Sequence, residues 1–381
     1  TFSGNNSNWS GGITVTNGAV FIAGADNAFG NGTIAGGNGF AATIRSSDAT
    51  DRTLANSISR SNGAAGTLVL GSAGTGNLTI QGGYSSTNNF ALDTIQVDNA
   101  WTQINGVVAS TGAAGPYTLT KSGNGTLILN GNNTYTLATT ISAGTLQIGA
   151  SGRLGGGSYS GNIAINGLTS AFVYAGTNNQ TLTGLISGNG VFTKNGSGML
   201  SINASNTIGA KTVNGGTLRI VAAGNVGGIG ASNSTVNLNN GSTLQLGGTT
   251  NSTSNNNAVY NGAVINIDST GGATVANDGL NGWIQFGGWF TINTNGGAQS
   301  QLTSLNSGYY NNQGASGGIL FNVASGSNAT ADVLVSVGGQ WGITKNGTGK
   351  VLITSSPNLN GLFAINGGTV EFGGSSAPTL T

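Results

Sequence analysis

A long pattern occurs three times in this chain and constrains its fold more than any other feature. Residues 118–149 read TLTKSGNGTLILNGNNTYTLATTISAGTLQIG, and degenerate copies stand at 191–221 and 342–373. Each copy contains a Thr-Lys pair, a Gly/Asn turn, a short apolar strand, a polar stretch and a Gly-Thr-Leu type strand. Such self-similarity predicts a stacked repeat, in which each unit buries its apolar face against its neighbours.

The residues between the repeats indicate short strands joined by sharp corners. Alternating runs such as TLQIG at 145–149 and STLQLG at 242–247 are typical of half-buried strands. Asn-Gly, Gly-Gly and Ser-Gly pairs separate many of these runs and favour tight turns. Glycine contributes 71 of 381 residues without a Gly-X-Y period, which excludes collagen. We therefore expect a single continuous β-solenoid over residues 1–381, with residues 250–330 as an atypical insertion or set of elaborated coils.

The charge content excludes several classes of partner. Ten basic and nine acidic residues leave a net charge of +1, and only 5% of the residues are charged. Binding to nucleic acid requires a basic stripe that neutralises phosphates, and the sequence has none. No apolar run approaches the roughly 20 residues that cross a bilayer as a helix. Cysteine is absent, so no disulfide framework is expected.

The first copy, its two degenerate copies and the lead-ins TLANSIS (53–59) and TLTGLISG (181–188) resemble the autotransporter-associated β-strand repeat. This family is also called the passenger-associated transport repeat, and the resemblance covers about half of the chain. It implies an elongated all-β fold, a right-handed parallel β-helix. It also implies export across a Gram-negative outer membrane as the passenger of a surface protein, and thus a secreted, extracellular or cell-surface location.

The residues that usually carry catalysis are scarce. Histidine and cysteine are absent, and Glu371 is the only glutamate. The strongest carboxylate group is Asp48 and Asp51, which stand between Arg45 and Arg52. It is either a site for Ca²⁺ or for polysaccharide cleavage, or a solvated coil corner with local Asp–Arg pairs. We favour the corner, and predict no enzyme activity, no metal and no cofactor.

Two further sets of charged residues are open to a functional and a structural interpretation. Asp93 and Asp98 surround an expected strand, where a metal role is the less favoured alternative. Lys121, Lys194 and Lys345 occupy equivalent repeat positions and either guide assembly or protect a ladder edge from unwanted pairing. The favoured alternative is that each of these lysines lies at an exposed corner.

The aromatic segment at residues 283–290 is the main anomaly. Alternation along a strand leaves large apolar side chains on both of its faces, and only one face can enter a solenoid core. The other face is covered by another part of the chain, by a neighbouring protein or by a glycan that stacks on the rings. The hypothetical contact patch comprises Trp283, Phe286, Trp289, Phe290, Tyr309 and Tyr310.

The repeat begins in mid-unit at the N-terminus and ends on a downstream half, which suggests head-to-tail assembly of copies into a filament or fibrous surface layer. The hypothetical interface comprises Ile13, Val15, Val20, Ile22, Thr369, Val370 and Phe372. The alternative function is a monomeric, anchored adhesin passenger that binds surface glycans. A third alternative, a polysaccharide-degrading enzyme, has little support from the residues present.

Overall fold

A computed structural model describes most of the chain. The described residues are 1–16, 18–37, 41–60, 66–86, 93–110, 118–203, 206–222, 234–248, 258–259, 263–268, 271–277, 284–285, 289–306, 318–326, 331–338, 342–354, 358–359, 362–373 and 379–380. The regular structure in these ranges consists of β-strands and one short 3₁₀ turn, Gly155–Gly157. The chain divides into two units, Thr1–Val191 and Phe192–Thr381, here called the N-terminal and C-terminal units.

The N-terminal unit is built from parallel ladders in which each strand pairs with strands of adjacent coils. One ladder contains β1 (Ile13–Val15), β3 (Ile34–Gly36), β6 (Ile58–Arg60), β9 (Tyr84–Ser86) and β12 (Val108–Ser110). A second contains β2 (Ala19–Ala23), β4 (Ala42–Ser46), β7 (Gly66–Leu70), β10 (Asp93–Val97), β13 (Leu119–Ser122), β15 (Thr139–Ile141), β18 (Ile163–Ile165) and β21 (Ile186–Gly188). A third contains β5 (Arg52–Leu54), β8 (Leu78–Ile80), β11 (Trp101–Ile104), β14 (Thr126–Leu129), β16 (Thr145–Ile148) and β19 (Ala171–Tyr174), and β17 (Ser158–Tyr159) pairs with β20 (Gln180–Leu182).

The C-terminal unit has two long ladders of the same kind. The first contains β22 (Val191–Lys194), β24 (Ala210–Val213), β26 (Thr235–Leu238), β29 (Val264–Ile267), β32 (Trp289–Thr294), β34 (Gly318–Val323), β36 (Gly342–Asn346) and β39 (Phe363–Ile365). The second contains β23 (Met199–Asn203), β25 (Thr217–Ala222), β27 (Thr243–Gly248), β30 (Thr274–Asn277), β33 (Ser300–Asn306), β35 (Val333–Gly338), β37 (Lys350–Ile353) and β40 (Thr369–Phe372). Two short pairs join β28 (Ala258–Val259) to β31 (Ile284–Gln285) and β38 (Asn358–Leu359) to β41 (Thr379–Leu380).

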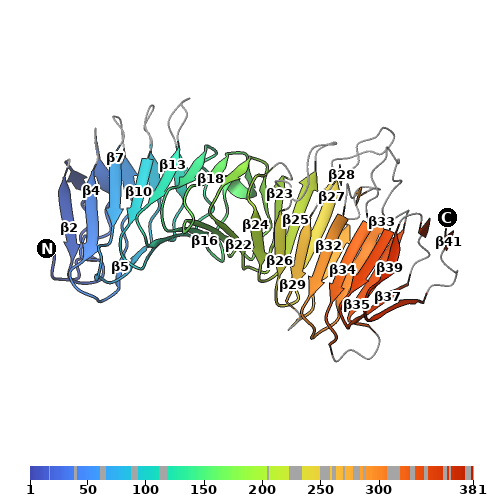
Figure 1. The fold of residues 1–381 in the computed structure, drawn as a ribbon. Coiled ribbons are helices and arrows are strands. Elements are labelled where there is room, and N and C mark those ends of the chain that lie inside the picture. The colour runs from blue at the N-terminus through green and yellow to red at the C-terminus, as the bar shows by residue number, and fades with distance from the viewer. Residues whose placement is uncertain are drawn as a thin grey trace. The chain divides into compact units, whose positions relative to one another are not determined.

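Alternation along each strand places the apolar side chains inside the coils. In β14, Leu127 and Leu129 are buried, whereas Thr126 and Ile128 face outward. Register carries this pattern from coil to coil, because Leu127 pairs with Leu146 and Leu146 pairs with Phe172, all fully buried. Figure 1 shows the strands of each unit side by side as parallel arrows. The expected all-β fold, a solenoid of stacked parallel coils, is confirmed.

Close stacking of the coils explains why the chain is rich in glycine. A Cβ atom on Gly76 would lie 1.9 Å from the carbonyl oxygen of Thr50 in the preceding coil. A Cβ atom on Gly106 would lie 2.3 Å from the backbone nitrogen of Gly83. Since adjacent strands are about 4.8 Å apart, corners of this kind have no room for a side chain. Among the described residues, no helix has the length and apolarity needed to span a membrane.

Candidate functional site

The residues of the hypothetical assembly interface lie on strands at the ends of ladders. Ile13 and Val15 belong to β1, Val20 and Ile22 to β2, and Thr369, Val370 and Phe372 to β40. Their exposure differs, because Val15 is buried in the core while Val20 is 56% exposed. The two sets belong to different units of one chain, so contact between them through two copies stays a prediction.

The aromatic segment is described only in part. Trp283, Phe286, Tyr309 and Tyr310 lie outside the described residues, and Trp289 is described only as the first residue of β32. Phe290 is fully buried and pairs with Ile319 of β34. One side chain of the segment therefore enters the core, and the role of the rest as a contact patch stays a prediction.

The acidic residues at 48–51 stabilise a coil corner. The Asp48 carboxylate accepts a hydrogen bond from the Thr50 backbone at 2.8 Å and pairs with Arg52 at 3.0 Å. The hydrogen bonds from Thr50, and then that from Ser47, lower the pKa of Asp48 to about 2. Asp51 accepts a bond from the backbone nitrogen of Asn77 in the next coil at 2.7 Å. Asp48 and Asp51 are exposed and Asp48 pairs with its neighbour Arg52, as expected of a solvated corner. Among the described residues, no group of three His, Cys, Asp or Glu could hold a metal.

Asp93 and Asp98 have structural partners of different kinds. The Asp93 carboxylate forms a buried ion pair with Arg60, which lies on β6 in the preceding coil. The partner of Asp98 is uncharged: its carboxylate accepts a hydrogen bond from Gln96 Nε2 at 2.6 Å. The charge of the Asp93 carboxylate is therefore balanced by a guanidinium from the same chain.

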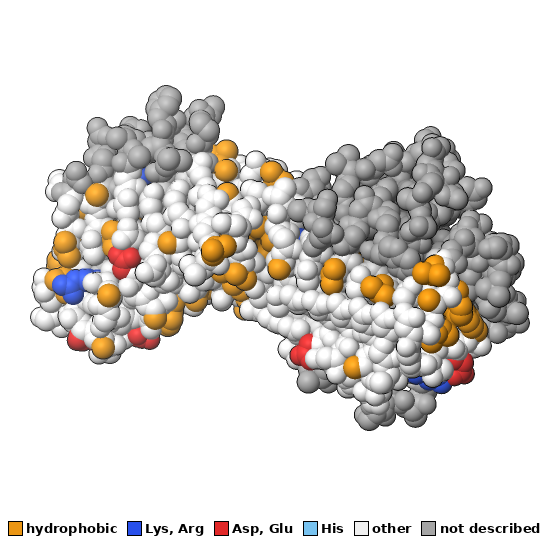
Figure 2. Space-filling model, in the orientation of Figure 1, with side chains coloured by type: hydrophobic (Ala, Val, Ile, Leu, Met, Phe, Trp, Pro, Cys, Tyr) orange, Lys and Arg blue, Asp and Glu red, His pale blue; other side chains and the backbone are white. Residues whose placement is uncertain are grey.

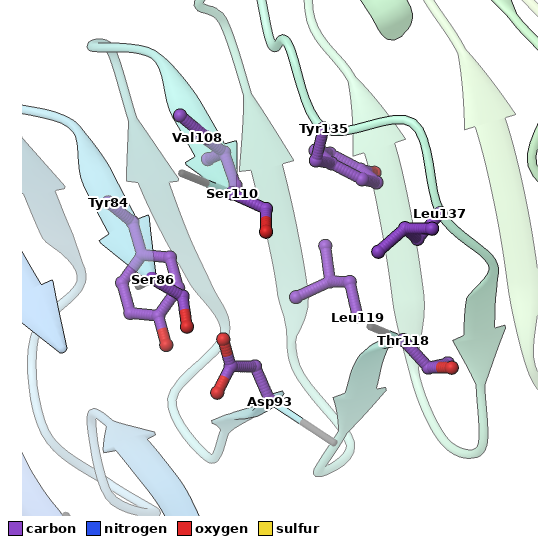
Figure 3. A pocket seen from close by; sticks show the side chains of 10 residues that line it. Tyr84, Ser86, Asp93, Val108, Ser110, Thr118, Leu119, Tyr135 and Leu137 are labelled. Atoms are coloured by element: carbon purple, nitrogen blue, oxygen red, sulfur yellow. The ribbon is translucent and has the colours of Figure 1, made fainter. Parts of the chain in front are cut away.

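A small cavity lies beside this ion pair. Figure 3 shows Tyr84 and Asp93 toward one side of it and Tyr135 and Leu137 toward the other. Its volume of about 30 Å³ is enough for about two water molecules. The hydroxyl of Ser86 lines the cavity and is buried, and it has no hydrogen-bond partner among the described residues. The cavity is too small for a sugar ring, so we do not assign a substrate to it.

The repeat lysines are buried, and the prediction that they lie at exposed corners is wrong. Lys121 is 0% exposed, and its Nζ atom donates to the carbonyl oxygens of Ser122 at 2.7 Å and Gly123 at 2.8 Å. A third bond reaches the Ala143 carbonyl of the following coil at 3.1 Å. The ammonium group thus closes its own turn and joins that turn to the next coil.

The other two copies repeat this lysine clamp, a name used here for Lys121, Lys194 and Lys345 with the carbonyls they bind. Lys345 donates to Asn346 at 2.6 Å, Gly347 at 2.8 Å and Gly367 of the next coil at 3.2 Å. Lys194 donates to Gly196 and, in the next coil, to Gly215 at 3.0 Å. Each acceptor in the next coil precedes a glycine with positive φ, at Gly144, Gly216 and Gly368.

Buried lysines make the stability of this protein depend on pH. Burial lowers the pKa of Lys121 and of Lys194 to about 8, and that of Lys211 to about 7, against 10.5 for an ordinary lysine. Between the lowered pKa of each folded lysine and the ordinary pKa of 10.5, the unfolded chain binds more protons than the folded chain. The free energy of unfolding therefore rises with pH in this range. Burial also raises the pKa of Tyr135 and of Tyr174 from 10.0 to about 12. Above pH 10 the unfolded tyrosines ionise first, so stability falls again.

We therefore expect the midpoint of urea unfolding to rise from about pH 7 to about pH 10 and to fall at higher pH. The measurement is a series of unfolding curves at constant ionic strength, recorded by circular dichroism. A midpoint that stays constant or falls between pH 7 and pH 9.5 would contradict the burial of these lysines as charged groups.

A row of asparagines runs along the outward face of the first ladder of the C-terminal unit. The side-chain amide of each residue donates to the Oδ1 atom of the preceding one at 2.8–2.9 Å. We call this row the asparagine stripe; it comprises Asn237, Asn266, Asn293, Asn322, Asn346 and Asn366. The stripe was not predicted from the sequence. Its signal is a triplet that ends each strand motif: TVN, VIN, TIN, LFN, TKN and AIN.

Comparisons with known proteins agree with the repeat pattern. The family model described as Passenger-associated-transport-repeat matches residues 119–148 and 192–220. The adhesin BmaC autotransporter of Brucella suis biovar 1 (strain 1330) is 33% identical over an alignment of 157 residues. That alignment covers 32% of this chain and 5% of the relative, so this chain corresponds to a small part of that protein. No solved structure matches the chain. The resemblance to the passenger-associated transport repeat is confirmed, and both matched segments contain a lysine clamp.

Proposed function

We propose that this chain is a non-enzymatic passenger segment of an autotransporter-like adhesin, and that it acts as a stacked-coil scaffold at the cell surface. The observation that carries this proposal is the lysine clamp, which lies in both segments that match the passenger repeat. A clamp that joins each turn to the next coil stabilises a stack, whereas it supplies no exposed reactive group. The name of the Brucella relative supports adhesion at a surface.

Surface display is tested on intact cells that produce the parent protein. Antibodies raised against the purified chain should label unpermeabilised cells, and added protease should release peptides of this chain into the medium. An antibody against a cytoplasmic protein, applied in parallel, controls for cell lysis. Labelling that requires permeabilisation would refute the proposed location.

Head-to-tail assembly is a second candidate function, and exposed apolar side chains on terminal strands favour it. Val20 on β2 is exposed, and so are Phe363 and Ile365 on β39. Phe363 and Ile365 pair with Ile343 and Lys345, which are buried, so they occupy core-facing positions that no further coil covers among the described residues. Strands at the end of a ladder also offer unpaired backbone groups to another strand. Contact between β40 of one copy and β1 and β2 of the next would generate an open fibre.

Negative-stain electron microscopy of the purified chain at several concentrations tests this assembly. We expect fibres from the natural sequence and discrete particles from the Val20→Asp and Val370→Asp variants. Thr120→Asp, which places the same charge on the outward face in mid-ladder, is the matched control and should still form fibres. Discrete particles from the natural sequence at every concentration would reject assembly.

A further inference from the structure

The asparagine stripe uses only part of its hydrogen-bonding capacity. A carboxamide has two N–H donors and a carbonyl oxygen with two lone pairs. Each link of the stripe uses one donor and one lone pair. Asn266, Asn293 and Asn322 are partly exposed, and Asn366 is exposed. The stripe therefore presents a row of remaining amide donors and acceptors to solvent, about 4.8 Å apart.

A second outward-facing row runs beside the stripe, two residues earlier in each strand. Strand register pairs Thr235 with Val264, Val264 with Thr291, Thr291 with Leu320, and Leu320 with Thr344. Hydroxyl and apolar side chains thus alternate along this row, and all five are partly exposed. The face formed by the two rows combines amides, hydroxyls and small apolar groups.

Neither row contains a charged residue. Figure 2 shows the sheet face of the C-terminal unit as a mainly white band with separate hydrophobic side chains, and the acidic and basic side chains lie below it. Anionic ligands are recognised by Arg and Lys, so this face does not suit a sulfated or phosphorylated polymer. It suits a neutral ligand that offers hydroxyl groups and apolar C–H surfaces.

We propose that this face binds a neutral, extended polysaccharide, which lies across the strands along the asparagine stripe. An extended β-linked glucan meets each requirement, because its hydroxyl groups can pair with the amides and its C–H faces can cover the apolar side chains. A sugar ring in such a chain is similar in length to one strand spacing, so successive rings meet successive coils. Each contact is weak, and affinity grows with the number of rings engaged.

The test uses the purified chain, cellobiose and cellohexaose, and isothermal titration calorimetry. We expect cellohexaose to bind at least about tenfold more tightly than cellobiose, and the flexible α-linked polymer dextran not to bind. The Thr291→Arg/Thr344→Arg variant should weaken cellohexaose binding by about tenfold or more. Thr243→Arg/Thr274→Arg, which alters the outward face of the other ladder, is the matched control and should bind normally.

Unfolding curves establish whether each variant is folded. If the Thr291→Arg/Thr344→Arg variant does not fold, Leu320→Ser replaces it as a milder change to the same row. Leu320→Ser removes one apolar contact and should weaken binding several-fold. The proposal is overturned if cellohexaose does not bind, or if the stripe and control variants bind it equally. A dimer that only the stripe variant disrupts, without glucan binding, would overturn it in favour of a second copy. Binding is measured on the purified chain and does not depend on surface display. The glucan-binding proposal and the proposed function at the cell surface can therefore fail separately.

Discussion

Replacement of Lys121 by methionine should lower the free energy of unfolding of the N-terminal unit by about 3 kcal/mol. Methionine fills similar space but donates no hydrogen bond, so the carbonyls of Ser122, Gly123 and Ala143 lose the donor that they share. A buried carbonyl left unpaired is unfavourable by about 1–3 kcal/mol. These three carbonyls are partly buried, so we expect the lower end of that range for each. Removal of a buried charge offsets part of this loss.

Urea unfolding measures the change, and Arg45→Met is the control in the same unit. Arg45 is partly exposed on β4 and donates to the Ser46 carbonyl at 3.1 Å, so its loss should change the free energy of unfolding by less than about 0.5–1 kcal/mol. The Lys121→Met variant should also show a weaker rise in stability between pH 8 and pH 10. Equal stability of the two variants would mean that the clamp does not stabilise the stack.

Replacement of Arg60 by methionine should destabilise the same unit by about 3–5 kcal/mol. Arg60 and Asp93 are both buried, and they join β6 to β10. Without the guanidinium, the buried Asp93 carboxylate loses its charged partner, and a buried charge left unpaired is strongly unfavourable.

The double variant Arg60→Met/Asp93→Leu separates the value of the ion pair from the penalty of an unpaired charge. Because both charges are removed together, we expect it to be more stable than Arg60→Met alone. Unfolding curves of both single variants and the double variant form a double-mutant cycle. If Arg60→Met alone is as stable as the double variant, the carboxylate is not desolvated in the folded protein.

The fold followed from the sequence because repetition and alternation are local signals. Runs such as Thr126–Leu129 alternate in polarity, and the recurrence of the whole pattern favours stacking over a sandwich. The corner at Asp48 could also be predicted from the sequence, because Arg52 and the turn residues that surround Asp48 are its close neighbours along the chain. The alternation and the corner depend on residues within a single coil, and the recurrence can be read directly along the sequence.

Features that depend on two coils were missed or misread. Lys121 looked like an exposed charge, because its sequence neighbours do not show that the Ala143 carbonyl, 22 residues later, completes its site. The partners of the asparagine stripe are similarly 20–29 residues apart. Asparagine is common throughout the chain, so the six triplets that carry the stripe do not stand out from other asparagines until the strand register is known.

The direction of the hydrogen bonds in the stripe makes the two sides of a coil unequal. Each of the five links runs the same way: the amide of one asparagine donates to the Oδ1 atom of the asparagine in the preceding coil, from Asn266 to Asn366. A coil added upside down would bring donor against donor or acceptor against acceptor. The two ends of the stripe are therefore chemically different, with donors directed toward one end and acceptors toward the other. Any lengthening of the stack that preserves the stripe must keep all coils in the same orientation.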